Sequence, residues 1–292
     1  MILFSGSSNK PLTEKIAKKA KLEMGRVEIT RFGDDETRVK LENDVKNKEV
    51  YILQSLCPPT DRHLIELLLL GDAAKRNGAK SLTAIIPWLG YSKQDKMFRE
   101  GEGVGSAVVA RAVESVGFNK VITINLHSEL IKKYWKIPVV ELSIYDQFIE
   151  IAKVYKNSVL IAPDLGGLER SRKFAKQLGV NLVQVMKERD RVTAIVNKEM
   201  KILGDVSGKT CIIIDDCVFS GQTLVYNADL LKTHGAKQVV CFVTHPVFDS
   251  QTMERLAKSK IDKLFVSDTI PLPNNKWEKI EVLSYDFSST LN

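Results

Sequence analysis

The chain has 292 residues, of which 44% are hydrophobic and 27% are charged. This length fits one large domain or, better, two medium-sized domains with ample material for apolar cores. The 43 basic and 36 acidic residues leave a formal charge of +7, which favours anionic partners. Because the basic residues are scattered and do not form one stripe, phosphorylated metabolites compete with nucleic acid as ligands.

Cysteine spacing and hydropathy argue against a cysteine-bound metal site, a signal peptide and a membrane span. The four cysteines, Cys57, Cys211, Cys217 and Cys241, lie far apart or inside apolar runs, with no CxxC pair and no metal-ligand spacing. They are expected to be reduced and mostly buried. The first apolar run is too short for a signal peptide, and no run approaches the ~20 apolar residues of a membrane span. We therefore expect a soluble, cytoplasmic protein that binds no membrane.

Short runs rich in Ile and Val alternate along the chain with longer segments of helical period. This order is typical of a parallel sheet covered by helices on both faces. In chain order, strands are expected at residues 2–6, 27–32, 49–55, 82–88, 120–127, 159–164, 181–187, 209–216, 238–245 and 263–268. Helices are expected at residues 9–22, 62–78, 106–117, 166–179 and 221–235.

The order of these elements repeats once along the chain. Residues 48–87 and 209–246 both read strand, loop, helix, Gly-Ala-Lys and strand, and residues 3–20 likewise parallel 160–179. A duplicated α/β domain explains this order with few assumptions. The pattern predicts an α/β fold with an N-terminal domain at 1–143 and a C-terminal domain at 144–292, with the tail from about 281 packing back on the first.

Two adjacent carboxylates, Asp215 and Asp216, follow the apolar run of the predicted strand 209–216. The first copy has Gln54 and Ser55 at the matching positions. In open α/β sheets, ligands bind beyond the carboxyl ends of the strands, so this pair is available to a ligand. Carboxylates only accept hydrogen bonds, and sugar hydroxyls are natural donors to such a pair.

Small residues follow the aspartates and lead into the predicted helix. Ser220, Gly221 and Thr223 let backbone N–H groups approach an anion at the helix N-terminus. Together with the aspartates, they predict a cradle for a phosphorylated sugar. A helix cap followed by an ordinary glycine turn is the other interpretation, and the spacing alone leaves both open.

The stretch "IIDDCVFSGQTL" resembles the phosphoribosyl-pyrophosphate loop of the type I phosphoribosyltransferase fold. Two tandem copies narrow the resemblance to the ribose-phosphate pyrophosphokinase family. The segments "RFGDDETRVKL", "IPWLGYSKQDK", "VITINLHS", "APDLGGLERSRKFAKQLG" and "KERDR" stand in that family's order, so the resemblance covers nearly the whole chain. The length and the segment "KQDKMFREGEGV" look closer to the shorter archaeal-type members. The resemblance implies two tandem type I phosphoribosyltransferase-like domains, each a mostly parallel sheet flanked by helices.

The resemblance also implies a reaction. In this family, the β,γ-diphosphoryl group of ATP moves to the anomeric hydroxyl of ribose 5-phosphate, and AMP is released with the help of Mg²⁺. The matching catalytic residues are Lys187 and Arg189, whose cations would stabilise the transferring charge. The matching metal ligands are His127 and Asp164. Taken alone, the charged run around Lys187 would be a solvated hairpin tip, and a lone histidine would be a cap or a core residue.

Substrate-binding residues are carried over from the same motifs. The expected ribose 5-phosphate site comprises Arg189, Asp215, Asp216, Phe219, Ser220, Gly221, Gln222 and Thr223. The expected ATP site comprises Asp34, Asp35, Glu36, Lys93, Gln94, Asp95 and Arg99. The family shares its ATP site between neighbouring subunits, which implies a homo-oligomer, either a dimer or a hexamer built from dimers. No nucleic-acid partner is expected.

Four positions depart from the family pattern. Asp35 stands where Gly is usual, Lys93 where Arg is usual, and "SGQT" replaces a Thr-Gly-Gly-Thr run, so that Gln222 is new; Phe219 replaces a small or acidic residue. Lysine lacks the planar fork of arginine, so these changes bear on nucleotide preference. A non-catalytic regulatory relative and a phosphoribosyltransferase remain the alternative functions.

Overall fold

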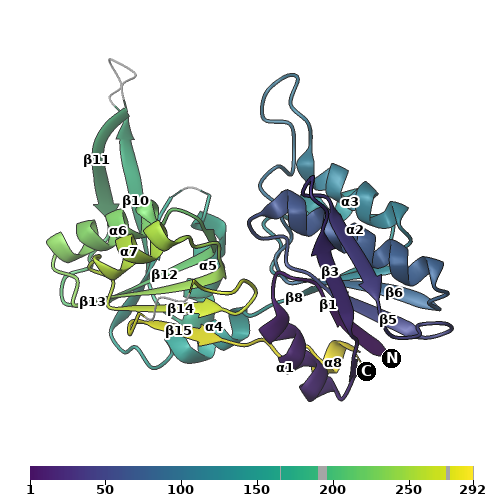
Figure 1. The fold of residues 1–292 in the computed structure, drawn as a ribbon. Helices are drawn as coiled ribbons and strands as arrows, with labels where there is room; N and C mark the ends of the chain where they lie inside the picture. Colours follow the sequence, from purple (N-terminus) through teal and green to yellow (C-terminus); the bar gives the residue numbers. More distant parts are fainter. Residues whose placement is uncertain (165, 190–195, 274–276, 292) are drawn as a thin grey trace. The chain divides into compact units, whose positions relative to one another are not determined.

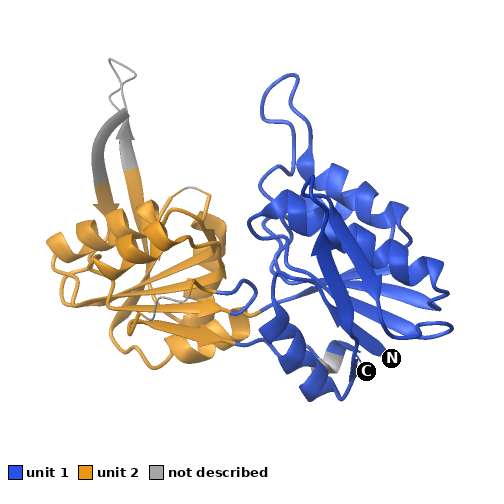
Figure 2. Ribbon diagram, in the orientation of Figure 1, with its two compact units in different colours: residues 1–143, 268–271, 284–292 blue, residues 144–267, 272–283 orange. Residues whose placement is uncertain are grey.

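The computed structural model describes residues 1–164, 166–189, 196–273 and 277–291, without the side chains of 187–189, 196–200, 288 and 289. The chain divides into two compact units (Figure 2). The first unit contains residues 1–143, 268–271 and 284–292, and the second contains 144–267 and 272–283. No helix among the described residues is long and apolar enough to span a bilayer.

The first unit is built on a six-stranded parallel sheet with the order β2-β1-β5-β6-β7-β8 (Figure 1). Its strands are β1 (Ile2–Ser5), β2 (Glu23–Met24), β5 (Glu49–Leu53), β6 (Ser81–Ile86), β7 (Lys120–Ile124) and β8 (Val139–Leu142). A separate antiparallel hairpin is formed by β3 (Val27–Arg31) and β4 (Thr37–Leu41). The helices are α1 (Lys10–Ala20), α2 (Thr60–Arg76), α3 (Gly105–Ser115), the short 3-10 helix η1 (Glu129–Tyr134) and α8 (Ser288–Leu291).

The second unit contains a seven-stranded sheet with the order β11-β10-β9-β12-β13-β14-β15. Its strands are β9 (Ser158–Ala162), β10 (Leu182–Arg189), β11 (Val196–Leu203), β12 (Thr210–Val218), β13 (Gln238–Pro246), β14 (Lys263–Ser267) and β15 (Ile280–Leu283). All neighbours are parallel except β10 and β11. The helices are α4 (Tyr145–Ala152), α5 (Leu168–Leu178), α6 (Gln222–Thr233) and α7 (Ser250–Ala257).

The two sheets have the same strand order when the edge strand β11 is set aside. β2-β1-β5-β6-β7-β8 in the first unit corresponds position by position to β10-β9-β12-β13-β14-β15 in the second. The predicted fold class, two tandem α/β domains with mostly parallel sheets, is therefore confirmed. The repeat also places residues 54 and 55 of the first unit at the positions of the two aspartates of the second.

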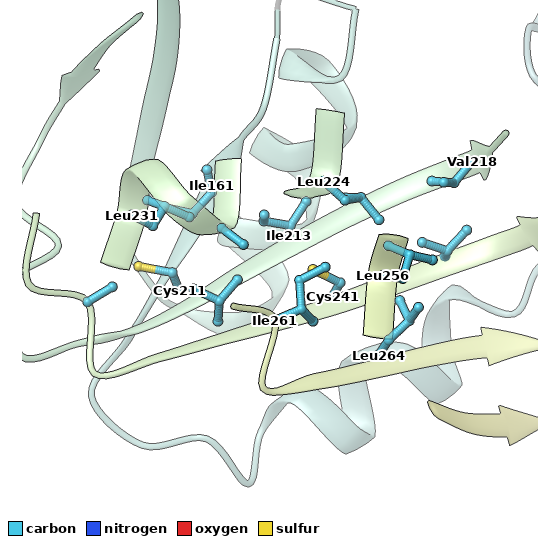
Figure 3. Close-up of a cluster of buried hydrophobic side chains, with 14 of the residues drawn as sticks. Ile161, Cys211, Ile213, Val218, Leu224, Leu231, Cys241, Leu256, Ile261 and Leu264 are labelled. Atoms are coloured by element: carbon cyan, nitrogen blue, oxygen red, sulfur yellow. The ribbon is translucent and has the colours of Figure 1, made fainter. Parts of the chain in front are cut away.

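Helices cover both faces of the second sheet. On one face, α6 and α7 pack against the strands through Leu224, Leu231 and Leu256 in a cluster with Ile213 and Cys241 (Figure 3). On the other face, aromatic rings join α4 and α5 to the sheet. Phe148 of α4 lies 5.3 Å from Phe242, measured between ring centroids. These contacts fix the starts of α5 and α6, which both lie at the carboxyl ends of strands.

The structure differs from the sequence expectation in several elements. The expected strand at 27–32 belongs to the β3–β4 hairpin and not to the parallel sheet. Short elements were missed because two to eight residues give little periodic signal: β2, β4, β8, β11, β15, η1, α4, α7 and α8. The expected strand 209–216 runs on to Val218, because β13 continues beside it to Pro246. The two aspartates, expected at the end of this strand, thus lie within it.

Candidate active site

The paired aspartates lie at the carboxyl edge of the second sheet. The neighbouring strand β9 pairs with β12 only as far as Ile213, so Asp215 and Asp216 extend past the end of β9. On the other side, β13 still pairs with Asp215 through Val243. The side chain of Asp215 is 25% exposed and that of Asp216 is 5% exposed. This is the edge at which open α/β sheets bind ligands.

One guanidinium contacts both carboxylates. Arg170, near the start of α5, places Nη1 2.9 Å from Oδ1 of Asp215 and Nη2 2.9 Å from Oδ1 of Asp216. The Arg170 side chain is only 18% exposed. The same Oδ1 of Asp215 also accepts the backbone N–H of Asp216 at 2.9 Å. No role was expected for Arg170, because it lies far from the aspartates in the chain.

Burial and charge perturb the ionisation of this cluster. Burial, with the neighbouring charge of Asp216, raises the pKa of Asp215 to about 7, although Arg170 acts in the opposite direction. Burial alone would lower the pKa of Arg170, but the negative charges around it, chiefly Asp216, outweigh burial and raise it. Arg170 therefore stays a cation, and Asp215 changes its charge near neutral pH. Titratable groups with shifted pKa values, placed at the sheet edge where ligands bind, are typical of functional sites.

The loop after the aspartates forms a sharp turn into α6. Gly221 has φ of 68°, in the left-handed region, and immediately precedes α6. No side chain caps the α6 N-terminus among the described residues, apart from a long 3.5 Å contact from the Gln222 N–H to Ser220 Oγ. The first amides of α6 are therefore donors for an anion, where the helix dipole adds a favourable field. Gln222 and Thr223 are exposed at this point.

Two side chains of helix α7 donate hydrogen bonds to the backbone of this loop. The Thr252 hydroxyl donates to the carbonyl of Phe219 at 2.8 Å, and Arg255 Nη1 donates to the carbonyl of Ser220. Because peptide groups are planar and trans, the amides that follow these carbonyls face away from α7. Neither α7 nor its two contacts were predicted from the sequence.

Substituting Gly221 by Ala is expected to lower the free energy of unfolding by about 1–3 kcal/mol, because the left-handed backbone strains any L side chain. A Cβ there would also lie 3.1 Å from Cδ2 of Leu256. The matched control is Gly179→Ala, since Gly179 has the same φ of 68° but no atom within 4 Å of a Cβ. Urea unfolding of both variants measures the difference. An equal loss in the two variants would show that the Leu256 contact is relieved without cost.

The matching position of the first unit is filled by its own side chains. Glu66 of α2 is buried, and its carboxylate accepts the N–H and the hydroxyl of Ser7 and the amide of Gln54. Gln54 Oε1 in turn accepts the N–H of Ser8 at 3.0 Å, and the Ser8 hydroxyl accepts the N–H of Ser55 at 2.8 Å. A Cβ on Gly6 would lie 2.3 Å from Gln54 Oε1. The first copy of the site is therefore closed by a satisfied polar network.

The catalytic and metal-binding residues expected from the sequence lie on or shortly after three different strands. Lys187 and Arg189 lie on β10, where the pairing with β11 changes register between them, but their side chains lie outside the described part of the chain. Asp164 follows β9, is exposed, and accepts the Gly167 N–H at 2.8 Å through Oδ1. His127 follows β7 in the first unit and is half-buried.

The predicted ATP residues 34–36 occupy the tip of the β3–β4 hairpin. Asp35 has φ of 70°, a conformation that favours glycine, the residue that the resemblance led us to expect there. Its carboxylate contacts two arginines, at 3.1 Å from Arg31 and 3.0 Å from Arg62. Asp34 Oδ1 accepts the Glu36 N–H at 3.2 Å. Asp35 is thus held by protein cations, whereas the neighbouring Phe32 ring is 53% exposed.

The other predicted ATP residues lie in the loop between β6 and α3. Lys93, Gln94 and Arg99 are exposed, whereas Asp95 is buried and its carbonyl accepts the Tyr134 hydroxyl at 2.6 Å. The loop tip is closed by Glu102, whose carboxylate accepts the N–H of Arg99 at 3.0 Å. The loop therefore presents its cations outward and anchors itself through Asp95.

Known proteins are similar to this chain in sequence. Residues 1–117 match the model of the N-terminal domain of ribose phosphate pyrophosphokinase, and residues 183–291 match a phosphoribosyl synthetase-associated domain. Ribose-phosphate pyrophosphokinase from Helicobacter hepaticus is 38% identical over 285 residues, which cover 97% of this chain and 91% of that protein. The chain belongs to the ribose-phosphate pyrophosphokinase family. The enzyme of the same name from Ralstonia nicotianae is 39% identical over 93% of this chain and 86% of its own length.

A solved structure extends the family comparison to the fold. The crystal structure of phosphoribosylpyrophosphate synthetase from Mycobacterium smegmatis superposes with a TM-score of 0.90 at 29% identity, covering 99% of this chain and 95% of that one. The resemblance inferred from the motifs is therefore confirmed, and the chain is assigned to a family of transferases in nucleotide biosynthesis.

Proposed function

We propose that this member of the ribose-phosphate pyrophosphokinase family catalyses the Mg²⁺-dependent reaction of ATP with ribose 5-phosphate. The anomeric hydroxyl attacks the β-phosphorus of ATP, the bond between the α,β-bridging oxygen and the β-phosphorus breaks, and AMP leaves. The hydroxyl proton is released, and the product is 5-phosphoribosyl 1-diphosphate. The observation that carries the proposal is the joint placement, at one sheet edge, of two acceptor carboxylates and the uncapped start of α6.

The second unit supplies the sugar site in this proposal. The amides at the start of α6, with Ser220, Gly221, Gln222 and Thr223, receive the 5-phosphate, because an anion is favoured at a helix N-terminus. Asp215 and Asp216 accept the two ring hydroxyls. Phe219 closes the loop with a 40% exposed ring. Arg189, with Lys187, brings positive charge to the transferring diphosphate, which stabilises a transition state with spread negative charge.

The proposed metal ligands are His127 and Asp164. Asp164 fits Mg²⁺, which prefers carboxylate oxygens and retained waters: its side chain is exposed, and only Oδ1 accepts a hydrogen bond from the described residues. Imidazole is a less usual ligand for this hard ion, so His127 is assigned a contact through water. When bound, the ion neutralises charge on the diphosphate. The protein's own part is to hold Asp164 at the sheet edge through the Gly167 N–H.

The first unit supplies nucleotide contacts in this proposal. Asp34 and Glu36 are acceptors for the adenine amino group, and Lys93, Gln94 and Arg99 are donors to adenine or to phosphates. Asp35 and Asp95 act differently, because the first is paired with arginines and the second is buried. Both are assigned to shaping the two loops. A homo-oligomer is proposed because α2 leaves Ile65 49% exposed within an apolar stretch, and light scattering of the dilute protein tests it.

The affinity for ribose 5-phosphate is expected to fall by about tenfold between pH 8 and pH 6. Hydroxyls donate to ionised Asp215, and its pKa is raised to about 7, so the accepting form is lost as the pH falls through that value. Since the folded-state pKa lies above the ordinary 3.8, ionised Asp215 also destabilises the ligand-free fold as the pH rises toward 7. Calorimetry at both pH values measures the change. The pH dependence of the affinity should shrink in Asp215→Asn. If it is unchanged in that variant, it arises from titration of the ligand's phosphate and not from Asp215.

The deciding experiment is AMP release by the purified full chain with ATP and Mg²⁺, with and without ribose 5-phosphate. AMP that forms only with the sugar phosphate supports the proposal. Absence of AMP together with absence of substrate binding would reject it. A phosphoribosyltransferase would consume the diphosphorylated sugar with a nucleobase, and product analysis separates that case. Binding without turnover would favour a regulatory relative.

A further inference from the structure

Two adjacent residues of a strand do not normally present their side chains to one ligand. Successive side chains point to opposite faces of a sheet, and Asp215 and Asp216 are consecutive in β12. Their Oδ1 atoms nevertheless both lie 2.9 Å from nitrogens of one guanidinium. The convergence is possible because β9 ends at Ala162, which leaves the edge of β12 open to the first turn of α5. The guanidinium of Arg170 therefore lies between the two carboxylates.

The place of Arg170 in its helix runs against the usual preference for charge. It is the third residue of α5, and cations are disfavoured near a helix N-terminus because the helix dipole is positive there. The following ring, Phe174, is buried one turn later and contacts Tyr145 edge to face, with centroids 4.9 Å apart. This packing fixes the α5 face that carries Arg170. The two carboxylates offset the unfavourable placement of the cation.

Two donors hold the carboxylate of Asp215 in place. Oδ1 accepts both Arg170 and the backbone N–H of Asp216. The side chain is still 25% exposed. A hydroxyl that approaches this edge therefore meets an acceptor whose rotamer is already fixed. Fixing a group before binding removes part of the entropy cost of binding.

We propose that Arg170 is the positioning residue of the ribose site: its planar fork draws the two carboxylates together so that they accept the hydroxyls of one diol. The proposal deepens the proposed function and rests on it. A guanidinium suits this role because its donors have a fixed spread that matches two carboxylate oxygens. A lysine would hold a point charge near the pair without setting the distance between the two acids.

The test compares three variants with wild type in AMP formation and in calorimetric titration with ribose 5-phosphate. Arg170→Gln is expected to raise the KM and the Kd for ribose 5-phosphate by about 10- to 100-fold, because misplaced groups lose productive geometry. The KM for ATP should change by less than about threefold, well under one tenfold step of about 1.4 kcal/mol. Arg170→Lys should restore part of the loss. The control is Arg172→Gln, because Arg172 lies on the same helix, is exposed and pairs with Glu169 at 3.0 Å.

Each outcome decides the proposal. A wild-type Kd for ribose 5-phosphate in Arg170→Gln overturns it, and so does an equal loss for both substrates. If Arg170→Gln does not fold, Arg170→Lys decides, because a wild-type Kd in that variant shows that the fork is not required. The titration needs no turnover. Wild-type protein that binds ribose 5-phosphate but makes no AMP would contradict the proposed reaction and leave the role of Arg170 measurable.

Discussion

Replacing Asp215 by Asn is expected to raise the KM for ribose 5-phosphate by about 10- to 100-fold, because a hydrogen bond to a charged acceptor contributes about 1.5–3 kcal/mol. The amide keeps the size of the side chain but carries no charge. It also weakens the contact with Arg170, which now lies 2.9 Å from Oδ1. The KM for ATP should change far less, since the proposed nucleotide residues lie on other loops. Steady-state kinetics with each substrate varied in turn measures both values.

The control for this substitution is Asp229→Asn. Asp229 lies on α6, the helix that begins at the phosphate loop, and its only described ion pair is a 3.9 Å contact with Lys260. It loses the same charge without touching the sugar edge, so both KM values should stay at wild type. Equal losses of affinity for ribose 5-phosphate and ATP in Asp215→Asn would contradict the assignment of the pair to the ribose hydroxyls.

The sequence predicted the fold class because the signal is long and repeated. Ten apolar runs alternate with helical segments, and the order of loops recurs, so no single element decides the result. The hairpin of β3 and β4 was not predicted, since its first strand has the same β-branched composition as a strand of the main sheet. Composition does not say which sheet a strand joins. That choice depends on contacts between residues far apart in the chain.

The site was predictable where its residues are neighbours in sequence. Asp215 and Asp216 stand side by side and are followed by small residues, so their spacing carried the prediction. Arg170 is 45 positions from Asp215 and stands among the charges of an amphipathic helix, where it looks like one more solvated cation. It reaches the aspartates only in the fold, where β9 ends early and leaves the edge of β12 open to the first turn of α5. Thr252 and Arg255 were missed for the same reason.

The closed site of the first unit contains a residue that local sequence could not predict. Gln54 and Ser55 were recognised as the substitutes for the aspartates, but the acid that satisfies Gln54 was not. Glu66 lies in a leucine-rich helix, where a single carboxylate would be assigned to the solvent face. In the structure it is 1% exposed and bonds to Ser7 and Gln54. A buried acid with hydrogen-bond partners in another loop leaves no local pattern to detect.

Replacing Lys187 by Ala is expected to lower kcat by about 100- to 1000-fold, the usual effect of removing one group that stabilises transition-state charge. The affinity for ribose 5-phosphate should change much less, because the carboxylates and the α6 amides remain. Single-turnover formation of AMP measures the chemical step directly.

The control for Lys187→Ala is Lys201→Ala. Lys201 is exposed on β11, where it pairs with Met186, the residue next to Lys187. This variant also removes one positive charge from the β10–β11 pair. It should keep the wild-type rate if the effect depends on the position of the charge and not on net charge. A wild-type rate in Lys187→Ala would instead remove Lys187 from the catalytic step. The charge on the transferring group would then have to be neutralised by Arg189 and the metal ion alone, and Arg189→Ala would become the decisive variant.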